Sequence, residues 1–379
     1  MGESVMLKFT NGQFKIMQIA DIQDTNKTAP DTIRFLEAAI DSEKPDLVVF
    51  TGDQVKGYGF NFKFGDAHKK VETALDNILS IIEKRKIPFT FCFGNHDQQA
   101  GMGKEEQLEF YRRYSCCMAQ ENDDPSLKGC ANHTLPIYSG DGKREVFALY
   151  LIDSHRNIKG LGYEPVDESQ INWYRKKRDE YAARNGGQPL PSIVFQHIPV
   201  QEVFQLLKQV KRTEKGAVQA FRIHKNEWYV LDFSKVNTEG FMRESPAIPD
   251  TNTGEFAAFR EKGDVLGVYF GHDHNNSFHG KVDGIDLGYC QGCGFNVYGP
   301  GLDRGVRMFV LNEDTVHRYN TYDVRYRQLL GKKLRRPLKN FIYTYAPTNL
   351  YDALYSIAKI TAGAAVVAAV IALLVLLLK

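Results

Sequence analysis

The sequence predicts a layered α/β protein followed by a helix able to cross a membrane. Three observations predict this: short apolar, β-branched or aromatic runs typical of strands, amphipathic helical patterns between them, and a long uncharged stretch close to residue 379. A chain of 379 residues with 43% hydrophobic and 25% charged residues has ample material for a large core.

The predicted strands are short runs rich in valine, isoleucine and phenylalanine, a composition that favours a pleated, buried surface. They cover Phe14–Ile19, Leu47–Thr51, Phe89–Phe93, Val146–Ile152, Ser192–Phe195, Val265–Phe270 and Val306–Val310.

Helical patterns lie between several of these runs. The first covers Thr32–Ser42, with Asp31 as its expected N-cap. Val71–Lys84 repeats apolar residues at three-four spacing, and Glu168–Ala183 is a charged amphipathic stretch. Alternation of strands with helices predicts sheets covered by helices.

The stretch from Ile360 to Leu378 contains no charged residue and approaches the ~20 residues that a helix needs to cross a bilayer. A buried core helix normally keeps a polar stripe, which this stretch lacks. We therefore predict a membrane anchor over residues 358–379. Small residues at Gly363, Ala364 and Ala368 could let two anchors self-associate.

Basic residues set the expected orientation of this anchor. They precede it at Lys332, Lys333, Arg335, Arg336, Lys339 and Lys359, whereas only Lys379 follows it. The positive-inside rule then places the large domain, residues 1–327, in the cytoplasm. Residues 328–357 are predicted to be a basic linker beside the anionic membrane face. The formal net charge of +2 argues against nucleic acid as a partner.

Six cysteines are spread along the chain without the density of a disulfide framework, so reduced thiols are expected. Cys290 and Cys293 form a lone CxxC, which could be redox-active or half of a zinc site. Because no second pair accompanies it, we favour small buried residues near a turn.

Polar motifs follow directly after five of the predicted strands. They are Asp21-Ile22-Gln23, Gly52-Asp53-Gln54, Gly94-Asn95-His96-Asp97, His197 and Gly271-His272-Asp273-His274. Ligands bind at the carboxyl ends of strands in α/β sheets, so these side chains are expected to converge. Carboxylates, imidazoles and an amide suit two divalent cations, with Mn²⁺, Fe and Zn²⁺ all compatible.

In this order the motifs resemble the signature of calcineurin-like metallophosphoesterases over residues 14 to about 310. Phe195–Pro199 and the GHDH motif resemble the purple-acid-phosphatase-like and bacterial phosphohydrolase branch. The resemblance implies two packed mixed β-sheets flanked by helices, a four-layer sandwich. It also implies hydrolysis of a phosphomonoester or phosphodiester by a metal-activated hydroxide.

The resemblance further implies a role for each motif residue. Asp21 and His274 would hold the first metal and Asp53 would bridge both. The second metal would be held by Asn95, His197 and His272. His96 would lie beside the substrate phosphate, with Asp97 orienting its ring.

Gln23 departs from the family pattern, where most members have histidine. A neutral amide oxygen is a weaker donor and would loosen the first metal, unless Asp24 compensates. Two hypotheses follow. The chain is either a phosphoesterase with a phosphorylated small molecule, lipid or nucleotide as substrate, or a catalytically weak metal-binding scaffold that binds a partner at the membrane.

Two segments are candidates for shaping the substrate site. The aromatic series Tyr58, Phe60, Phe62 and Phe64 could grip an apolar leaving group, although a strand packed on the core is the favoured interpretation. The roughly 70 residues between His197 and Gly271 exceed one strand-helix step and predict a lid or rim.

Overall fold

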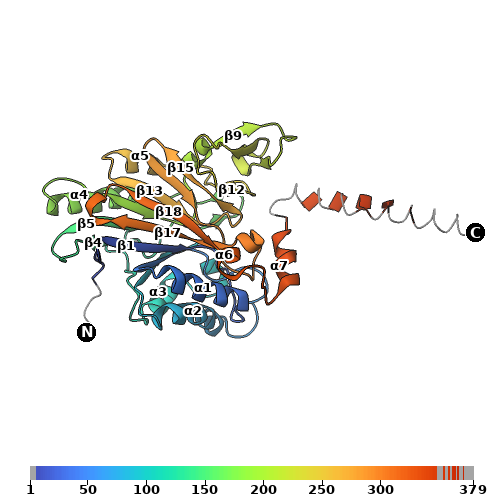
Figure 1. The fold of residues 1–379 in the computed structure, drawn as a ribbon, viewed down its shortest axis with the longest axis horizontal. Coiled ribbons are helices and arrows are strands. Elements are labelled where there is room, and N and C mark those ends of the chain that lie inside the picture. Colours follow the sequence, from blue (N-terminus) through green and yellow to red (C-terminus); the bar gives the residue numbers. More distant parts are fainter. Residues whose placement is uncertain are drawn as a thin grey trace, which may run out of the picture.

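The computed structural model describes residues 6–347 and scattered residues between 353 and 370. Two large β-sheets pack face to face at its centre, and helices cover their outer faces (Figure 1). The buried side chains between the sheets include Phe14, Ile16, Leu47, Val49, Leu149, Leu151, Ile193, Phe195 and Phe309. The predicted α/β architecture with two mixed sheets flanked by helices is confirmed.

The first sheet has the strand order β18-β17-β1-β2-β3. Its strands are β1 (Gln13–Ile19), β2 (Leu47–Thr51), β3 (Phe89–Cys92), β17 (Gly305–Asn312) and β18 (Tyr319–Arg325). β1, β2 and β3 run parallel, whereas β17 and β18 join antiparallel. The helices on its outer face are α1 (Pro30–Glu43), α2 (Ala67–Glu83) and α3 (Lys104–Tyr111).

The second sheet has the order β15-β16-β13-β8-β5-β4. Its strands are β4 (His133–Tyr138), β5 (Glu145–Leu151), β8 (Ser192–Phe195), β13 (Val265–Phe270), β15 (His279–Val282) and β16 (Ile285–Tyr289). The four central strands are parallel, and β4 and β15 close the edges antiparallel. α4 (Glu168–Arg184) and α5 (Glu255–Arg260) cover its outer face.

Short elements lie outside the two large sheets. One small sheet contains β9 (Leu207–Val210), β10 (Val218–Gln219) and β11 (Trp228–Leu231). Two-stranded pairs join β6 (Asn157–Ile158) with β7 (Gly162–Tyr163) and β12 (Phe241–Met242) with β14 (Asn276–Ser277). The 3-10 turns are η1 (Asp97–Ala100), η2 (Gln201–Leu206), η3 (Arg222–His224), η4 (Gly301–Asp303) and η5 (Glu313–Thr315).

Every strand predicted from an apolar run is present, but the expected N-cap of α1 is wrong. α1 begins at Pro30, and its N-cap Ala29 has no capping side chain. The Asp24 carboxylate instead accepts from the Ala29 N–H at 3.0 Å. Asp31 accepts from the backbone N–H groups of Arg335 and Arg336, at 2.8 and 3.0 Å. It therefore attaches the segment after β18 to the domain.

The basic segment predicted as a linker is folded against the domain in its first part. α6 (Tyr326–Leu330) and α7 (Pro337–Thr344) lie at one edge of the molecule (Figure 1). The boundaries at residues 327 and 357 stay predictions. Within the described part of the chain, no helix is long and apolar enough to cross a bilayer. Most of the predicted anchor, residues 358–379, lies outside that part, so the anchor also stays a prediction.

Candidate active site

The predicted motifs meet where the carboxyl ends of the two sheets come together. Asp21, Asp53 and Asn95 follow β1, β2 and β3, while His197 follows β8 and the GHDH motif follows β13. Ligand atoms of Asp21, Asp53 and His197 all lie within 4.8 Å of one another, and all three residues are fully buried. Each sheet therefore supplies part of a single cluster.

The backbone is strained where it presents these side chains. Asp21, Gln23, Asp53 and His272 have positive φ angles of 50°, 38°, 55° and 73°, in a region that residues other than glycine rarely adopt. Gly94 permits a close approach to Asp53, because a Cβ at this position would lie 2.1 Å from Asp53 Oδ1. This strain is held in place by the surrounding strands and turns.

One half of the cluster is centred on the His197 ring. Its Nδ1 donates to the Thr51 carbonyl at 2.8 Å, which leaves Nε2 as the ring nitrogen that faces the rest of the cluster. Nε2 lies 3.0 Å from Asn95 Oδ1, 3.2 Å from His272 Nδ1 and 3.4 Å from Asp53 Oδ2. These atoms are the donor set predicted for the second metal.

The other half contains Asp21 and His274. Tyr298 fixes the His274 ring twice, since its carbonyl lies 3.0 Å from Nδ1 and its own ring stacks at 4.2 Å. His274 Nε2 then lies 3.4 Å from Asp21 Oδ1. Asp21 Oδ1 and His272 Nε2 are buried and have no hydrogen-bond partner among the described residues. The Asp21 oxygen, an acceptor left without a donor, fits a divalent cation.

The electrostatics of the cluster also fit a cation. Burial would raise the pKa of Asp53, but the His197 and His96 imidazoles outweigh it and hold the pKa of this carboxyl below its ordinary value. Burial would lower the pKa of His197, whereas Asp53 and Asp21 raise it to about 10. Without an ion, a proton on His197 balances the two carboxylates. A divalent cation would supply the same positive charge in place of that proton.

Gln23 reaches the cluster, but it presents its NH₂ group. Nε2 donates to Asp53 Oδ2 at 2.7 Å, and Oε1 accepts from the Tyr58 hydroxyl at 2.9 Å. Because Asp53 can only accept, this arrangement fixes which way the amide points. Asp24 does not compensate. Its oxygens bond Thr25, Ala29, Thr32 and Asn296, so its carboxylate is committed to the start of α1.

The expected contact between Asp97 and the His96 ring is wrong. The Asp97 carboxylate accepts from the backbone N–H groups of Asp53, Val55 and Gly94, so it shapes the turns that carry the ligands. Gln99 Oε1 instead pairs with His96 Nδ1 at 2.9 Å. The ring also packs on Tyr58, with centroids 4.5 Å apart. His96 lines the open pocket.

A pocket of about 670 Å³ opens above the cluster. Aromatic and basic side chains form its walls, among them Tyr58, Tyr163, Phe221, Arg222, Lys225 and Tyr298. Ala220 through Arg222 come from the segment between His197 and Gly271, so the predicted rim role of this segment agrees with the pocket lining. The Tyr58 to Phe64 series is a loop, and the favoured strand interpretation is wrong. Phe62 is buried, whereas Phe60 and Phe64 are exposed.

Glu244 was not identified from the sequence. Its buried carboxylate accepts from the Asn275 N–H at 2.6 Å and from the Tyr298 hydroxyl at 3.1 Å, and burial raises its pKa to about 7. It thereby supports the Tyr298 ring on which His274 stacks. No strand predicted from the sequence and no motif precedes Glu244, so the sequence carried no signal for it.

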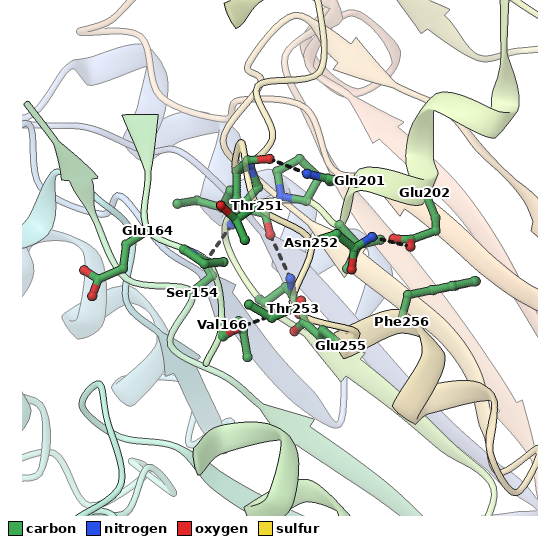
Figure 2. Close-up of a pocket in the computed structure, with 16 residues that line it drawn as sticks. Ser154, Glu164, Val166, Gln201, Glu202, Thr251, Asn252, Thr253, Glu255 and Phe256 are labelled. Carbon is green, nitrogen blue, oxygen red and sulfur yellow. Dashed lines mark hydrogen bonds between the residues drawn. The ribbon is translucent and has the colours of Figure 1, made fainter. Parts of the chain in front are cut away.

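A much smaller pocket of about 20 Å³ lies behind the turn that carries His197 (Figure 2). Its walls are tied together by hydrogen bonds: Gln201 to the Pro249 carbonyl at 2.8 Å, Asn252 to Glu202 at 2.8 Å and Thr253 to the Val166 carbonyl at 2.7 Å. The Ser154 hydroxyl accepts from the Ile198 N–H at 2.8 Å. This network supports the position of His197.

The CxxC pair is not part of the site. Cys290 and Cys293 are both fully buried free thiols, and burial raises the pKa of each. This agrees with the interpretation as small buried residues.

Comparison with known proteins assigns this site to a family. The model of the calcineurin-like phosphoesterase family matches residues 14–276, which is more than half of the chain. The chain belongs to the calcineurin-like phosphoesterase family. The resemblance read from the motifs is confirmed.

Relatives of this chain include a protein named as a phosphatase and a protein named as a probable inactive phosphatase. It is 29% identical to probable inactive purple acid phosphatase 29 of Arabidopsis thaliana, over 81% of this chain and 79% of the relative. It is 26% identical to phosphatase DCR2 of Saccharomyces cerevisiae, over 81% of this chain and 53% of the relative. A solved dimetal phosphatase from Danio rerio is 13% identical, with a TM-score of 0.49, over 83% of this chain and 99% of that one.

Proposed function

We propose that the chain is a metal-dependent phosphoesterase that hydrolyses a phosphomonoester or phosphodiester. The observation that carries this proposal is the buried cluster of Asp21, Asp53 and His197, which opens into a pocket lined by His96. A purely structural cluster of buried carboxylates would be costly unless a cation compensated it. Family membership supports the same chemistry.

Each residue would take the metal-binding role that its motif suggests. Asp21 and His274 would hold one divalent ion, Asn95, His197 and His272 another, with Asp53 between them. Mn, Fe and Zn remain the candidates. When bound, such ions lower the pKa of water and neutralise charge on phosphate oxygens. The Thr51 and Tyr298 carbonyls hold Nδ1 of His197 and His274, so Nε2 of each ring would be the nitrogen available to an ion.

His96 would act on the substrate from the pocket side. Gln99 holds Nδ1 and Tyr58 holds the ring face, so Nε2 is the atom free to meet a phosphate or leaving-group oxygen. A proton donated there stabilises the departing alkoxide. The phenol rings of Tyr58, Tyr163 and Tyr298 line the same pocket and suit an apolar or aromatic leaving group.

The experiment is a phosphate-ester assay on the purified full chain with Mn²⁺ added. We expect metal-stimulated turnover that falls about 10²–10⁴-fold in His96→Ala, the range lost with a general acid. The matched control is His68→Ala, since His68 is exposed and outside the pocket, and its turnover should match the unmodified chain. Equal turnover in His96→Ala and the unmodified chain would contradict the proposal.

The second candidate is a catalytically weak metal-binding scaffold. One observation favours it: Gln23 presents its NH₂ group and contributes no oxygen to the first metal position. Absence of turnover with several metals and phosphorylated substrates, in protein that still binds metal, would support the scaffold.

We further propose that residues 358–379 tether the domain to the cytoplasmic side of a membrane, with a phosphorylated metabolite, lipid or nucleotide as substrate. The uncharged stretch and the basic residues before it support this. Alkaline carbonate should leave the full chain in the membrane pellet, and its release into the supernatant would overturn the tether. Self-association through Gly363, Ala364 and Ala368 should appear as crosslinked dimers in detergent.

A further inference from the structure

α7 presents an apolar stripe that the domain does not cover. Leu338, Phe341, Ile342 and Tyr345 are exposed by 72%, 61%, 58% and 71%. Their spacing of three and four residues places them on one face of the helix, with Tyr345 as its C-cap residue. Large exposed apolar groups are common singly, but a continuous stripe on one short helix marks an interaction surface.

The opposite face holds α7 firmly to the domain. Asn340 is buried, and Lys339 Nζ bonds Asn296 Oδ1. The Tyr343 carbonyl accepts from the Gly299 N–H at 3.3 Å, and the Tyr343 ring lies 5.4 Å from Lys56 Nζ. The stripe therefore faces outward on a helix with a fixed orientation.

A cluster of positive charge lies directly before the stripe. Lys332, Lys333, Arg335 and Arg336 are exposed, and they form no ion pair within the described residues. Between Val324 and Tyr351 the sequence contains no Asp or Glu. An apolar stripe beside a basic cluster is the pattern of helices that lie in the surface of an anionic bilayer.

We propose that α7 is an interfacial helix, which inserts Leu338, Phe341, Ile342 and Tyr345 into the surface of an anionic lipid bilayer. The uncharged stretch from Ile360 supports this occupant, because the intervening residues reach at most about 50 Å even when fully extended. A second copy of the chain fits less well, since a two-fold contact through the stripe would bring two basic clusters together.

This arrangement determines where the pocket lies relative to the membrane surface. The residues under α7, from Asn296 to Gly301, include Tyr298, and Lys56 lies two positions before Tyr58. Tyr298 and Tyr58 are both walls of the pocket. With α7 in the interface, the pocket lies beside the lipid headgroups. The proposal does not depend on catalysis.

The test is tryptophan quenching in the full chain, reconstituted in vesicles whose acyl chains carry bromine. Co-sedimentation is no test, because the predicted anchor would bring the chain to vesicles by itself. We expect Phe341→Trp to lose most of its added emission, and to lose more in phosphatidylserine-containing vesicles than in phosphatidylcholine alone. Lys176→Trp is the matched control, an exposed position on α4 at the opposite side of the molecule (Figure 1).

A further variant tests the basic cluster. Lys332→Gln, Arg335→Gln and Arg336→Gln together leave the backbone hydrogen bonds to Asp31 available. In the Phe341→Trp chain, these substitutions should abolish the additional quenching seen with phosphatidylserine. The proposal is overturned if the added emission of Phe341→Trp is quenched no more than that of Lys176→Trp. It is also overturned if the tryptophan of Phe341→Trp is shielded from both bromolipid and aqueous acrylamide, which would indicate a protein contact such as a second copy.

Discussion

At the scale of single residues, the orientation of Gln23 bears on the proposed first metal position. Tyr58 holds Oε1, so the NH₂ group faces Asp53. We predict that Gln23→His, which offers a ring nitrogen, raises the metal content of protein dialysed against a limiting concentration of Mn²⁺. Elemental analysis measures this directly.

The matched control for Gln23→His is Gln188→His, in an exposed turn after α4. It adds a histidine to the chain without changing the cluster, so its metal content should equal that of the unmodified protein. Equal metal content in Gln23→His and Gln188→His would show that Gln23 does not limit binding.

A second prediction at the scale of single residues concerns Gly94. A methyl group there would meet Asp53 Oδ1 at 2.1 Å and push the central ligand away. We expect Gly94→Ala to lower the free energy of unfolding by about 1–3 kcal/mol, the usual cost of overpacking, and to reduce metal content as well. Gly103→Ala is the control, because its nearest neighbour lies 3.4 Å away. Similar losses in urea titrations of both variants would contradict this explanation.

The sequence predicted the residues that gather at the cluster better than the hydrogen-bond partners of those residues. Asp21, Asp53, Asn95, His197 and His272 could be named because each follows a strand whose carboxyl end is fixed by sheet topology. The hydrogen-bond partner of the His96 ring could not be named from the sequence. Both Asp97 and Gln99 lie within reach of its ring in sequence, and only the 3-10 turn η1 turns Asp97 toward the backbone and Gln99 toward Nδ1.

At the scale of elements, β3 and β4 connect the two sheets through a buried histidine. His133 of β4 pairs with the Thr90 hydroxyl of β3 at 2.6 Å and with the Ala131 carbonyl at 2.7 Å. Burial lowers the pKa of His133 to about 4, below its ordinary value of 6.5. The folded protein therefore binds this proton less readily than the unfolded chain does.

The sign of the pH dependence follows. Between pH 6.5 and 4 the unfolded state binds more protons, so this contribution to stability is complete above pH 6.5 and is lost as the pH falls toward 4. The loss amounts to roughly 3 kcal/mol. Urea unfolding at several pH values should show a weaker acid dependence in His133→Asn than in the unmodified chain. Exposed His317→Asn should retain the full dependence. Identical pH profiles for all three proteins would exclude His133 as the cause.

The sequence predicted the strands that form apolar runs, whereas strands of mixed sequence, such as β18 at a sheet edge, were missed. β2 and β8 are buried along their whole length, and such apolar runs are unambiguous. β18 alternates half-buried and exposed residues, and its tyrosines and charges gave no clear pattern. The small sheet of β9, β10 and β11 carries many polar residues. Only the unusual length of the segment between His197 and Gly271 therefore indicated a rim.

For the whole molecule, the cluster connects the two sheets at their carboxyl edges. β1 and β2 supply Asp21 and Asp53, and β8 and β13 supply His197 and His274, so a bound ion would bridge both halves of the core. Composition and motif order predicted this arrangement because chain topology fixes which strand ends meet. The course of residues 326–347 could not be predicted, since it depends on the contacts that Asp31 makes with backbone N–H groups.

A ligand that binds only where both sheets are folded must stabilise the whole molecule. At a Mn²⁺ concentration 100 times its Kd this amounts to about 2.7 kcal/mol, which corresponds to a rise in Tm of several degrees. Thermal unfolding with Mn²⁺ and after chelation should show this shift. Asp53→Ala, which removes the carboxylate shared by both positions, should lose it, whereas Asp232→Ala in an exposed turn should retain it. If Asp53→Ala and the unmodified chain respond equally to Mn²⁺, the ion binds elsewhere and this cluster does not hold the two sheets together.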